Sequence, residues 1–136
     1  MLKISISCFF ILIFSTISYA DKVDFSTKIW PIIKEKCIKC HRAPYKNDKG
    51  KTKKPKAGLR LDTAEHIMKG SEDGKVIVAG KPKESSFYTL TLLDKDDDDV
   101  MPSDAAKKGV LTKEQKELIK NWITEGANFG SFKTGK

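Results

Sequence analysis

The pentapeptide Cys37-Ile38-Lys39-Cys40-His41 is the feature that most constrains this chain. Its two thiols are three residues apart, so each can add to one vinyl group of a porphyrin, and the adjacent imidazole can then bind the iron from that side. A short-loop disulfide between the two cysteines is the alternative in an oxidising compartment, but the histidine that follows at once favours haem. The chain is therefore expected to fold around one covalently attached haem c, with His41 as the proximal ligand.

Residues 1–20 have the features of a secretory signal peptide. Lys3 supplies positive charge, an apolar stretch follows, and the Ser-Tyr-Ala sequence that ends at Ala20 is a small-x-small cleavage site, so Asp21 is the expected mature N-terminus. An uncleaved membrane anchor is the alternative, although the apolar run is short for a membrane span. Cys8 lies too early to be a lipoprotein site. We expect an exported, periplasmic protein.

The rest of the chain is the length of one ordinary domain. Residues 21–130 are assigned to a single haem-binding domain, and residues 131–136 to a C-terminal tail. The chain carries 26 Lys and Arg against 18 Asp and Glu, a formal net charge of +8. This charge favours acidic redox proteins as partners, or peripheral contact with an anionic membrane surface, and export argues against a nucleic acid.

Hydrophobic periodicity predicts four helices and no credible sheet, so the expected fold class is all-α. Apolar side chains recur at three-to-four-residue spacing over residues 24–41 and again in the last helix, which is expected to run from Thr112 to Gly126. The other two helices are shorter, and are expected at residues 63–69 and from Ser85 or Ser86 onward.

The sequence also predicts how these helices begin and end. The expected N-caps are Ser26 or Thr27 for the first helix, Asp62 with Glu65 in a capping box for the second, and Thr112 with Gln115 in a capping box for the last. Residues after Phe129 are expected to form a frayed tail.

Two charged loops separate the helices. Residues 43–56 contain six lysines, from Lys46 to Lys56, and are expected to be either a mobile, solvated loop or a docking patch for an acidic redox partner. Residues 94–99 contain five aspartates interrupted only by Lys95. They lack the fixed glycine and terminal glutamate of an EF-hand loop, which favours a solvated turn over a calcium site.

The second axial ligand of the iron decides between electron transfer and gas binding. Met101 is the favoured candidate, because it lies far enough along the chain from His41 for a loop-and-helix layer to wrap to the distal face, and because Pro102 stiffens the backbone behind it. A core methionine is the alternative. His66 and Met68 share a short expected helix, where a surface histidine and a packed methionine are the favoured interpretations.

In this order and spacing the motifs resemble those of the planctomycete-type cytochrome c domain, a branch of the small class I-like monohaem c-type cytochromes. The matching stretches are residues 29–33 (IWPII), 37–41 (CIKCH), 58–63 (GLRLDT), 78–82 (VAGKP), 85–86 (SS), 101–102 (MP), and 111–127 from Leu-Thr through Trp-Ile to Gly-Ala. The resemblance covers most of residues 21–130. It implies a cytochrome c-like helical domain with haem c on Cys37 and Cys40, His41 proximal and Met101 distal. The family often has Met-Pro-Pro where this chain has Met-Pro-Ser, a change that keeps the ligand.

The expected function is therefore single-electron transfer between redox proteins, with no substrate chemistry and so no enzyme activity. A haem-based sensor or gas-binding protein with a labile or absent distal ligand is the alternative, and a haem-free thiol oxidoreductase or zinc site is a third. Two roles are open for Arg60. It either pairs with a haem propionate or is a surface arginine between two core leucines.

Overall fold

The computed structural model describes residues 22–103 and 109–135. The expected signal peptide lies outside this part of the chain, so its cleavage stays a prediction. The described chain is mostly helical, which confirms the all-α expectation, with one short hairpin added. The elements in chain order are η1 (Phe25–Ile29), α1 (Trp30–Lys36), β1 (Tyr45–Lys46), β2 (Thr52–Lys53), η2 (Lys56–Gly58), α2 (Ala64–Lys69), η3 (Pro82–Glu84), α3 (Ser86–Thr89), η4 (Leu90–Leu92) and α4 (Lys113–Thr124).

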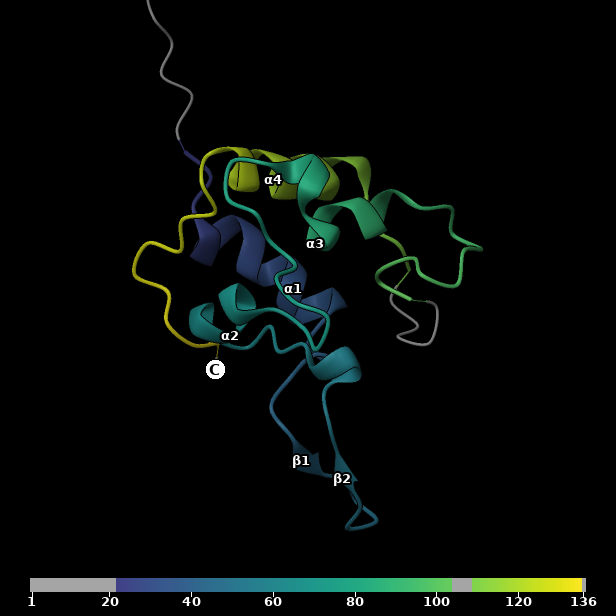
Figure 1. Cartoon of the computed structure of the whole chain (residues 1–136). Coiled ribbons are helices and arrows are strands. Elements are labelled where there is room, and N and C mark those ends of the chain that lie inside the picture. The colour runs from purple at the N-terminus through teal and green to yellow at the C-terminus, as the bar shows by residue number, and fades with distance from the viewer. Residues whose placement is uncertain (1–21, 104–108, 136) are drawn as a thin grey trace, which may run out of the picture.

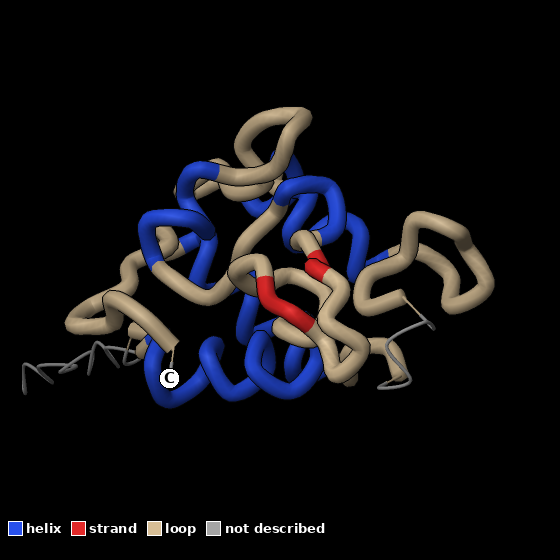
Figure 2. Tube along the Cα trace, turned by 90° about the horizontal axis from the view of Figure 1, so that it is seen from below, coloured by secondary structure: helices blue, strands red, loops and turns tan. Residues whose placement is uncertain are grey.

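The helices form one body and the hairpin projects from it. Figure 1 shows α4 at the top of the molecule, α3 beside it, α1 beneath them and α2 below, while β1 and β2 extend away from the helices. Figure 2 shows that the rest of the regular structure is helical and is joined by long loops. No helix in the described residues is long and apolar enough to cross a membrane.

The N-terminal helix starts as the wide π-type turn η1 and continues directly into α1. Its N-cap is Asp24, whose carboxylate accepts hydrogen bonds from the Thr27 N–H at 2.8 Å and the Thr27 hydroxyl at 2.7 Å. The expectation of Ser26 or Thr27 as the cap was therefore wrong: the hydroxyl donates to a better acceptor one turn earlier. These bonds also hold the pKa of Asp24 below its usual 3.8.

The same helix ends at Lys36, before the cysteine motif and not at its end. The N–H groups of Cys37 and Ile38 both donate to the Ile33 carbonyl, and the N–H groups of Cys40 and His41 both donate to the Cys37 carbonyl. The chain therefore leaves the helix at Cys37 and carries the motif on a tight turn.

The core lies between the N-terminal helix and α4. Phe25 stands at its centre, with its ring centroid 5.1 Å from that of Trp122 and 4.6 Å from that of Phe129. The Trp122 indole N–H donates to the Asn128 carbonyl at 2.7 Å, so this buried polar group is satisfied. The buried apolar cluster consists of Phe25, Ile29, Ile32, Ile33, Leu61, Ile67, Val76, Ile77, Leu111, Ile119, Trp122, Ile123 and Ala127.

The C-terminal segment packs on this core as far as it is described, so the prediction of a frayed tail after Phe129 was wrong. The Phe132 ring lies 4.7 Å from Phe25 and 5.0 Å from Trp30, centroid to centroid. The Lys133 carbonyl accepts from the Ala64 N–H, which joins the tail to the start of α2. Aromatic burial offsets the entropy that the tail loses on docking.

Of the predicted N-caps of the first, second and last helices, only that of the last was correct. Thr112 and Gln115 form the expected capping box of α4. At α2 the cap is Thr63 and not Asp62: the Thr63 side chain accepts from the His66 N–H. The Asp62 carboxylate binds the Arg60 side chain and the Ala43 N–H instead.

The hairpin was not expected, because its strands are polar and too short to show alternation. Tyr45 pairs with Lys53 and Lys46 with Thr52. Gly50 closes the turn with a φ of 71°, a conformation that suits glycine.

Candidate functional site

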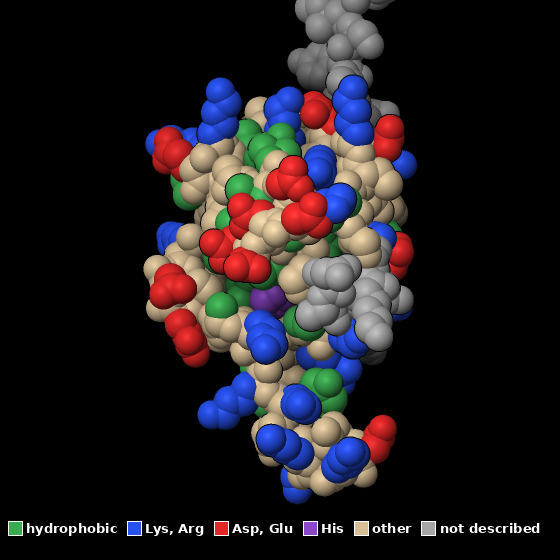
Figure 3. All heavy atoms as spheres, turned by 90° about the vertical axis from the view of Figure 1, so that its right-hand side faces the viewer, with side chains coloured by type: hydrophobic (Ala, Val, Ile, Leu, Met, Phe, Trp, Pro, Cys, Tyr) green, Lys and Arg blue, Asp and Glu red, His purple; other side chains and the backbone are tan. Residues whose placement is uncertain are grey.

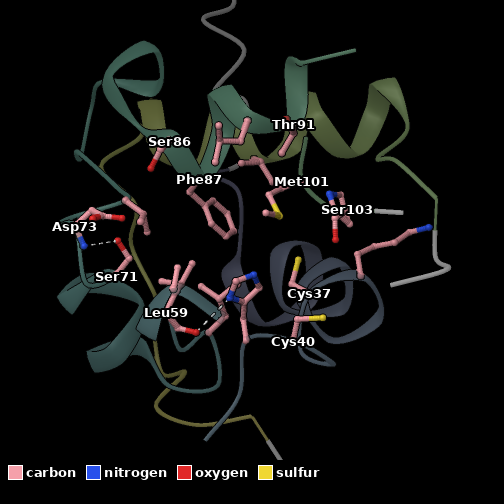
Figure 4. A pocket seen from close by; sticks show the side chains of 18 of the residues that line it. Cys37, Cys40, Leu59, Ser71, Asp73, Ser86, Phe87, Thr91, Met101 and Ser103 are labelled. Carbon is pink, nitrogen blue, oxygen red and sulfur yellow. Dashed lines mark hydrogen bonds between the residues drawn. The ribbon is translucent and has the colours of Figure 1, made fainter. Parts of the chain in front are cut away.

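A cavity of about 390 Å³ opens between the cysteine turn, the segment after η2, α3 and the loop before α4. Its volume lies in the range of about 300–1,000 Å³ typical of sites for bound small molecules and cofactors. The side chains that line it are largely apolar or small, and the main ones are Cys37, Cys40, His41, Leu59, Leu61, Val76, Phe87, Leu90, Met101, Leu111 and Ile119. Figure 4 shows part of this lining.

The two cysteines lie on one wall of the cavity as free, half-buried thiols. Burial raises the pKa of Cys37 to about 12; the nearby Cys40 raises it further and Lys36 partly opposes the rise. The thiol is therefore protonated at neutral pH. Within the described residues no group of three or more His, Cys, Asp and Glu side chains could hold a metal ion, which disfavours the zinc alternative.

The histidine of the motif is held by the segment that follows η2. Nδ1 of His41 lies 3.3 Å from the Leu59 carbonyl oxygen, and the Leu61 N–H donates to the His41 carbonyl at 2.9 Å. A carbonyl only accepts, so Nδ1 carries the proton and Nε2 is left with its lone pair for a metal. Burial lowers the pKa of His41, which keeps the ring neutral and able to bind one.

Met101 reaches the same cavity from the other side. Its N–H donates to the Leu90 carbonyl at 3.1 Å, so the start of η4 fixes its backbone. In Figure 4 the Met101 sulfur points into the cavity toward Cys37, and the Phe87 ring lies beside it. The structure thus brings the predicted Cys37, Cys40, His41 and Met101 together around one space.

The other two ligand candidates do not line this cavity. Both ring nitrogens of His66 are engaged elsewhere: Nδ1 lies 2.6 Å from the Thr63 hydroxyl and Nε2 lies 2.9 Å from an Arg60 nitrogen. Met68 packs, partly buried, against the hydrophobic core. The packing of Met68 agrees with the interpretation favoured from sequence, whereas His66 is half-buried and not a surface histidine.

Arg60 is also directed away from the cavity. Its guanidinium forms two hydrogen bonds with the Asp62 carboxylate, at 3.0 and 2.9 Å, and it is not among the lining residues. The structure therefore does not bring the proposed propionate partner to the site. The cationic side chains that do line it are Lys36 and Lys75, which were not predicted from the sequence.

These residues fit a covalently bound haem. Two thiols and an imidazole nitrogen stand on one wall, a thioether enters from the other, and the space between is lined mainly by apolar groups. Thioether and imidazole are the donors that hold haem iron in cytochromes c. A small helical domain with this site has the features of a c-type cytochrome.

Comparison with protein families identifies the family. The model described as Planctomycete cytochrome C matches residues 37–104, half of the chain, and the chain belongs to this family. The match begins at Cys37 and reaches past Met101. No curated protein and no solved structure matched the chain. Membership implies a haem-based electron carrier, and proteins of this family are typically not enzymes.

Proposed function

We propose that this protein is a periplasmic monohaem cytochrome c that carries single electrons between redox proteins. Cys37 and Cys40 hold the haem through thioether bonds, His41 is the proximal ligand and Met101 the distal one. The haem iron supplies the reversible one-electron couple between Fe(III) and Fe(II). The observation that carries the proposal is that Cys37, Cys40, His41 and Met101 all line one apolar cavity.

The protein's own residues prepare this site in three ways. The Leu59 carbonyl orients the His41 ring and directs Nε2 away from the backbone. The buried lining excludes water and lowers the local dielectric, which influences the reduction potential. The Met101 thioether favours Fe(II), which suits a carrier near the oxidising end of an electron-transport chain.

A haem-based sensor is the second candidate, and one observation favours it. Among the described residues, His41 makes hydrogen bonds through its N–H, its carbonyl and its ring, whereas the hydrogen bond found for Met101 is the one from its N–H to the Leu90 carbonyl. A gas molecule could therefore displace Met101 from the iron more easily than it could displace His41.

The mature protein, made together with a haem-maturation system, tests the proposal. We expect the haem spectrum to remain with the chain after denaturation and organic extraction, a reversible one-electron titration, and no spectral change when CO is added to the reduced protein. Haem that extracts from the chain would contradict covalent attachment. Rapid CO binding would favour the sensor.

A further inference from the structure

Two segments of opposite charge flank the cavity. The basic hairpin, defined here as residues 45–56, contains six lysines and one aspartate, and the acidic loop, residues 94–99, contains five aspartates and one lysine. In Figure 3, Lys and Arg side chains cover the projecting hairpin, Asp and Glu side chains gather on the other side, and a histidine is visible between them.

The basic hairpin is a structured element, in contrast to a mobile loop. The Asn47 N–H donates to the Lys51 carbonyl, and the Asn47 side-chain oxygen accepts from the N–H groups of Lys49 at 3.2 Å and Lys51 at 2.9 Å. At its base the Arg42 guanidinium lies 4.2 Å from the centre of the Tyr45 ring. The lysines are therefore displayed on a fixed scaffold, at lower entropic cost to a partner.

The charge of this hairpin is not neutralised within the protein. All six of its lysines are exposed, and no ion pair is found for any of them in residues 22–103 and 109–135. By contrast, Lys95 of the acidic loop pairs with Asp96 at 2.6 Å, and four other aspartates remain there. The face around the cavity is therefore strongly positive on one side and negative on the other.

Each charged segment is attached to one side of the site. The basic hairpin follows His41 closely, and the Lys56 N–H at its end donates to the Cys40 carbonyl at 3.0 Å. The acidic loop leads directly into Met101, and the Val100 N–H donates to the Asp97 carbonyl at 3.2 Å. A partner bound to the hairpin is therefore held beside the proximal wall.

We propose that this bipolar face docks an acidic protein, with the basic hairpin as the attractive half and the acidic loop setting the orientation by repulsion. The inference rests on the proposed electron-carrier function and names the partner of that same site. Complementary charge raises association rates and fixes register more than it raises affinity. That suits a transient electron-transfer complex, which must form and separate quickly.

The observations favour a protein surface over a membrane. An anionic bilayer is a broad negative plane, which would attract the hairpin and repel the acidic loop on the same face. Among the described residues the exposed large apolar side chains are Leu92 and Val110, and neither belongs to the hairpin. The hairpin therefore has charge but no exposed large apolar group for insertion.

The test uses the haem-loaded protein and three matched variants. The first carries Lys46→Gln, Lys49→Gln and Lys51→Gln; the second carries the same positions as arginine. The control carries Lys22→Gln, Lys28→Gln and Lys83→Gln, at exposed positions that do not line the cavity. The probes are a short polyglutamate peptide, followed by NMR, and ferricyanide, which takes one electron from the Fe(II) protein to give Fe(III) protein and ferrocyanide.

We expect polyglutamate to shift the amide signals of the hairpin and to slow ferricyanide reduction competitively. At low salt the hairpin glutamine variant should react with ferricyanide at least about tenfold more slowly, because a unit charge about 10 Å away changes the rate for a singly charged anion by about twofold and ferricyanide carries three negative charges. The arginine variant should match the wild type, and the control should change less. Asp96→Asn with Asp98→Asn should act in the opposite direction and speed the reaction.

Equal effects of the hairpin and control glutamine variants would overturn the docking proposal, because only total charge would then matter. Binding to vesicles of phosphatidylglycerol and phosphatidylcholine through the hairpin, without binding to polyglutamate, would also overturn it and assign the surface to a membrane. An unchanged haem spectrum in every variant separates these outcomes from a failure of the proposed haem ligation.

Discussion

The two walls of the cavity are built differently. On the proximal wall, the Cys37 and Cys40 carbonyls accept three backbone hydrogen bonds, and the His41 ring and carbonyl are both engaged by the segment that contains Leu59 and Leu61. On the distal wall, the hydrogen bond found for Met101 within residues 22–103 and 109–135 is the one from its N–H to the Leu90 carbonyl. The fold therefore fixes the proposed proximal ligand, His41, whereas the position of the proposed distal ligand, Met101, would depend more on its bond to iron.

This difference has a consequence for function. Segments with few hydrogen bonds and little core contact are the first to open locally. If the iron–sulfur bond holds, both axial ligands stay in place during reduction and oxidation, as a carrier requires. If it is weak, the same fold opens on the distal side alone and becomes a site for small ligands. The comparison of the two walls is therefore also a comparison of the two candidate functions.

The largest expected effect is on the proximal wall. Replacing both thiols, Cys37→Ala with Cys40→Ala, removes the groups that add to the porphyrin, so we expect complete loss of covalently attached haem. Haem staining of the denatured chain after electrophoresis measures this directly. Ser103→Ala, which alters another cavity residue, serves as the control and should keep the stain. Haem that stays bound to the double variant after denaturation would contradict the attachment.

The two walls should also differ in how much they contribute to stability. Ile33 is fully buried in the main core and precedes the cysteine turn, so Ile33→Ala should lower the free energy of unfolding by about 2–5 kcal/mol. Val100 is 3% exposed but lies outside that cluster, and Val100→Ala should cost about 1–2 kcal/mol. Chemical denaturation of the haem-loaded variants checks this. A greater loss per deleted carbon at Val100 would reverse the comparison.

A smaller effect, which depends on pH, is expected from Asp62. Burial by itself would raise the pKa of this carboxyl, but hydrogen bonds from the Arg60 guanidinium and the Ala43 N–H outweigh it and hold the pKa below 3.8. As the pH falls, Asp62 is therefore protonated in the unfolded chain before it is protonated in the folded protein. The stability that Asp62 contributes is present above about pH 3.8 and is lost as the pH falls through the folded-state pKa.

Asp62→Asn isolates this contribution from those of other carboxyl groups. Near neutral pH the variant should be less stable than the wild type by about 1–2 kcal/mol, because charge-assisted hydrogen bonds are lost. The difference between the two proteins should shrink as the pH falls below about 3.8. A difference that stays constant down to low pH would show that the charge of Asp62 does not stabilise the segment beside the cysteine turn.

Local sequence was enough to predict some of the features that depend on neighbouring residues, although it missed Asp24 as the cap of the first helix. The capping box of Thr112 and Gln115 needs residues only three positions apart, and it was found where expected. The cluster of Cys37, Cys40 and His41 in one cavity also follows from spacing within a single turn. Met101 was predicted from its place along the chain, and the structure brings it to that cavity.

Features that depend on distant partners could not be predicted in this way. Asp62 has the sequence of a helix cap, but Arg60 and the Ala43 N–H bind its carboxylate, so Thr63 takes the capping role. The C-terminal segment has no periodicity of its own, and it is ordered by the contact of Phe132 with Phe25. The hairpin carries lysines at six of its nine exposed positions, which hides the alternation that indicates a strand.

The optical spectrum of the oxidised protein, compared with that of Met101→Ala, tests the central claim most directly. The wild type should show a six-coordinate, low-spin iron with the weak charge-transfer band of an iron–thioether bond. Met101→Ala should lose that band, become high-spin and bind CO when reduced, while Met68→Ala, which removes the core methionine, should keep the wild-type spectrum. An unchanged spectrum in Met101→Ala, or a wild type without the band, would contradict the distal ligand and with it the proposed six-coordinate carrier.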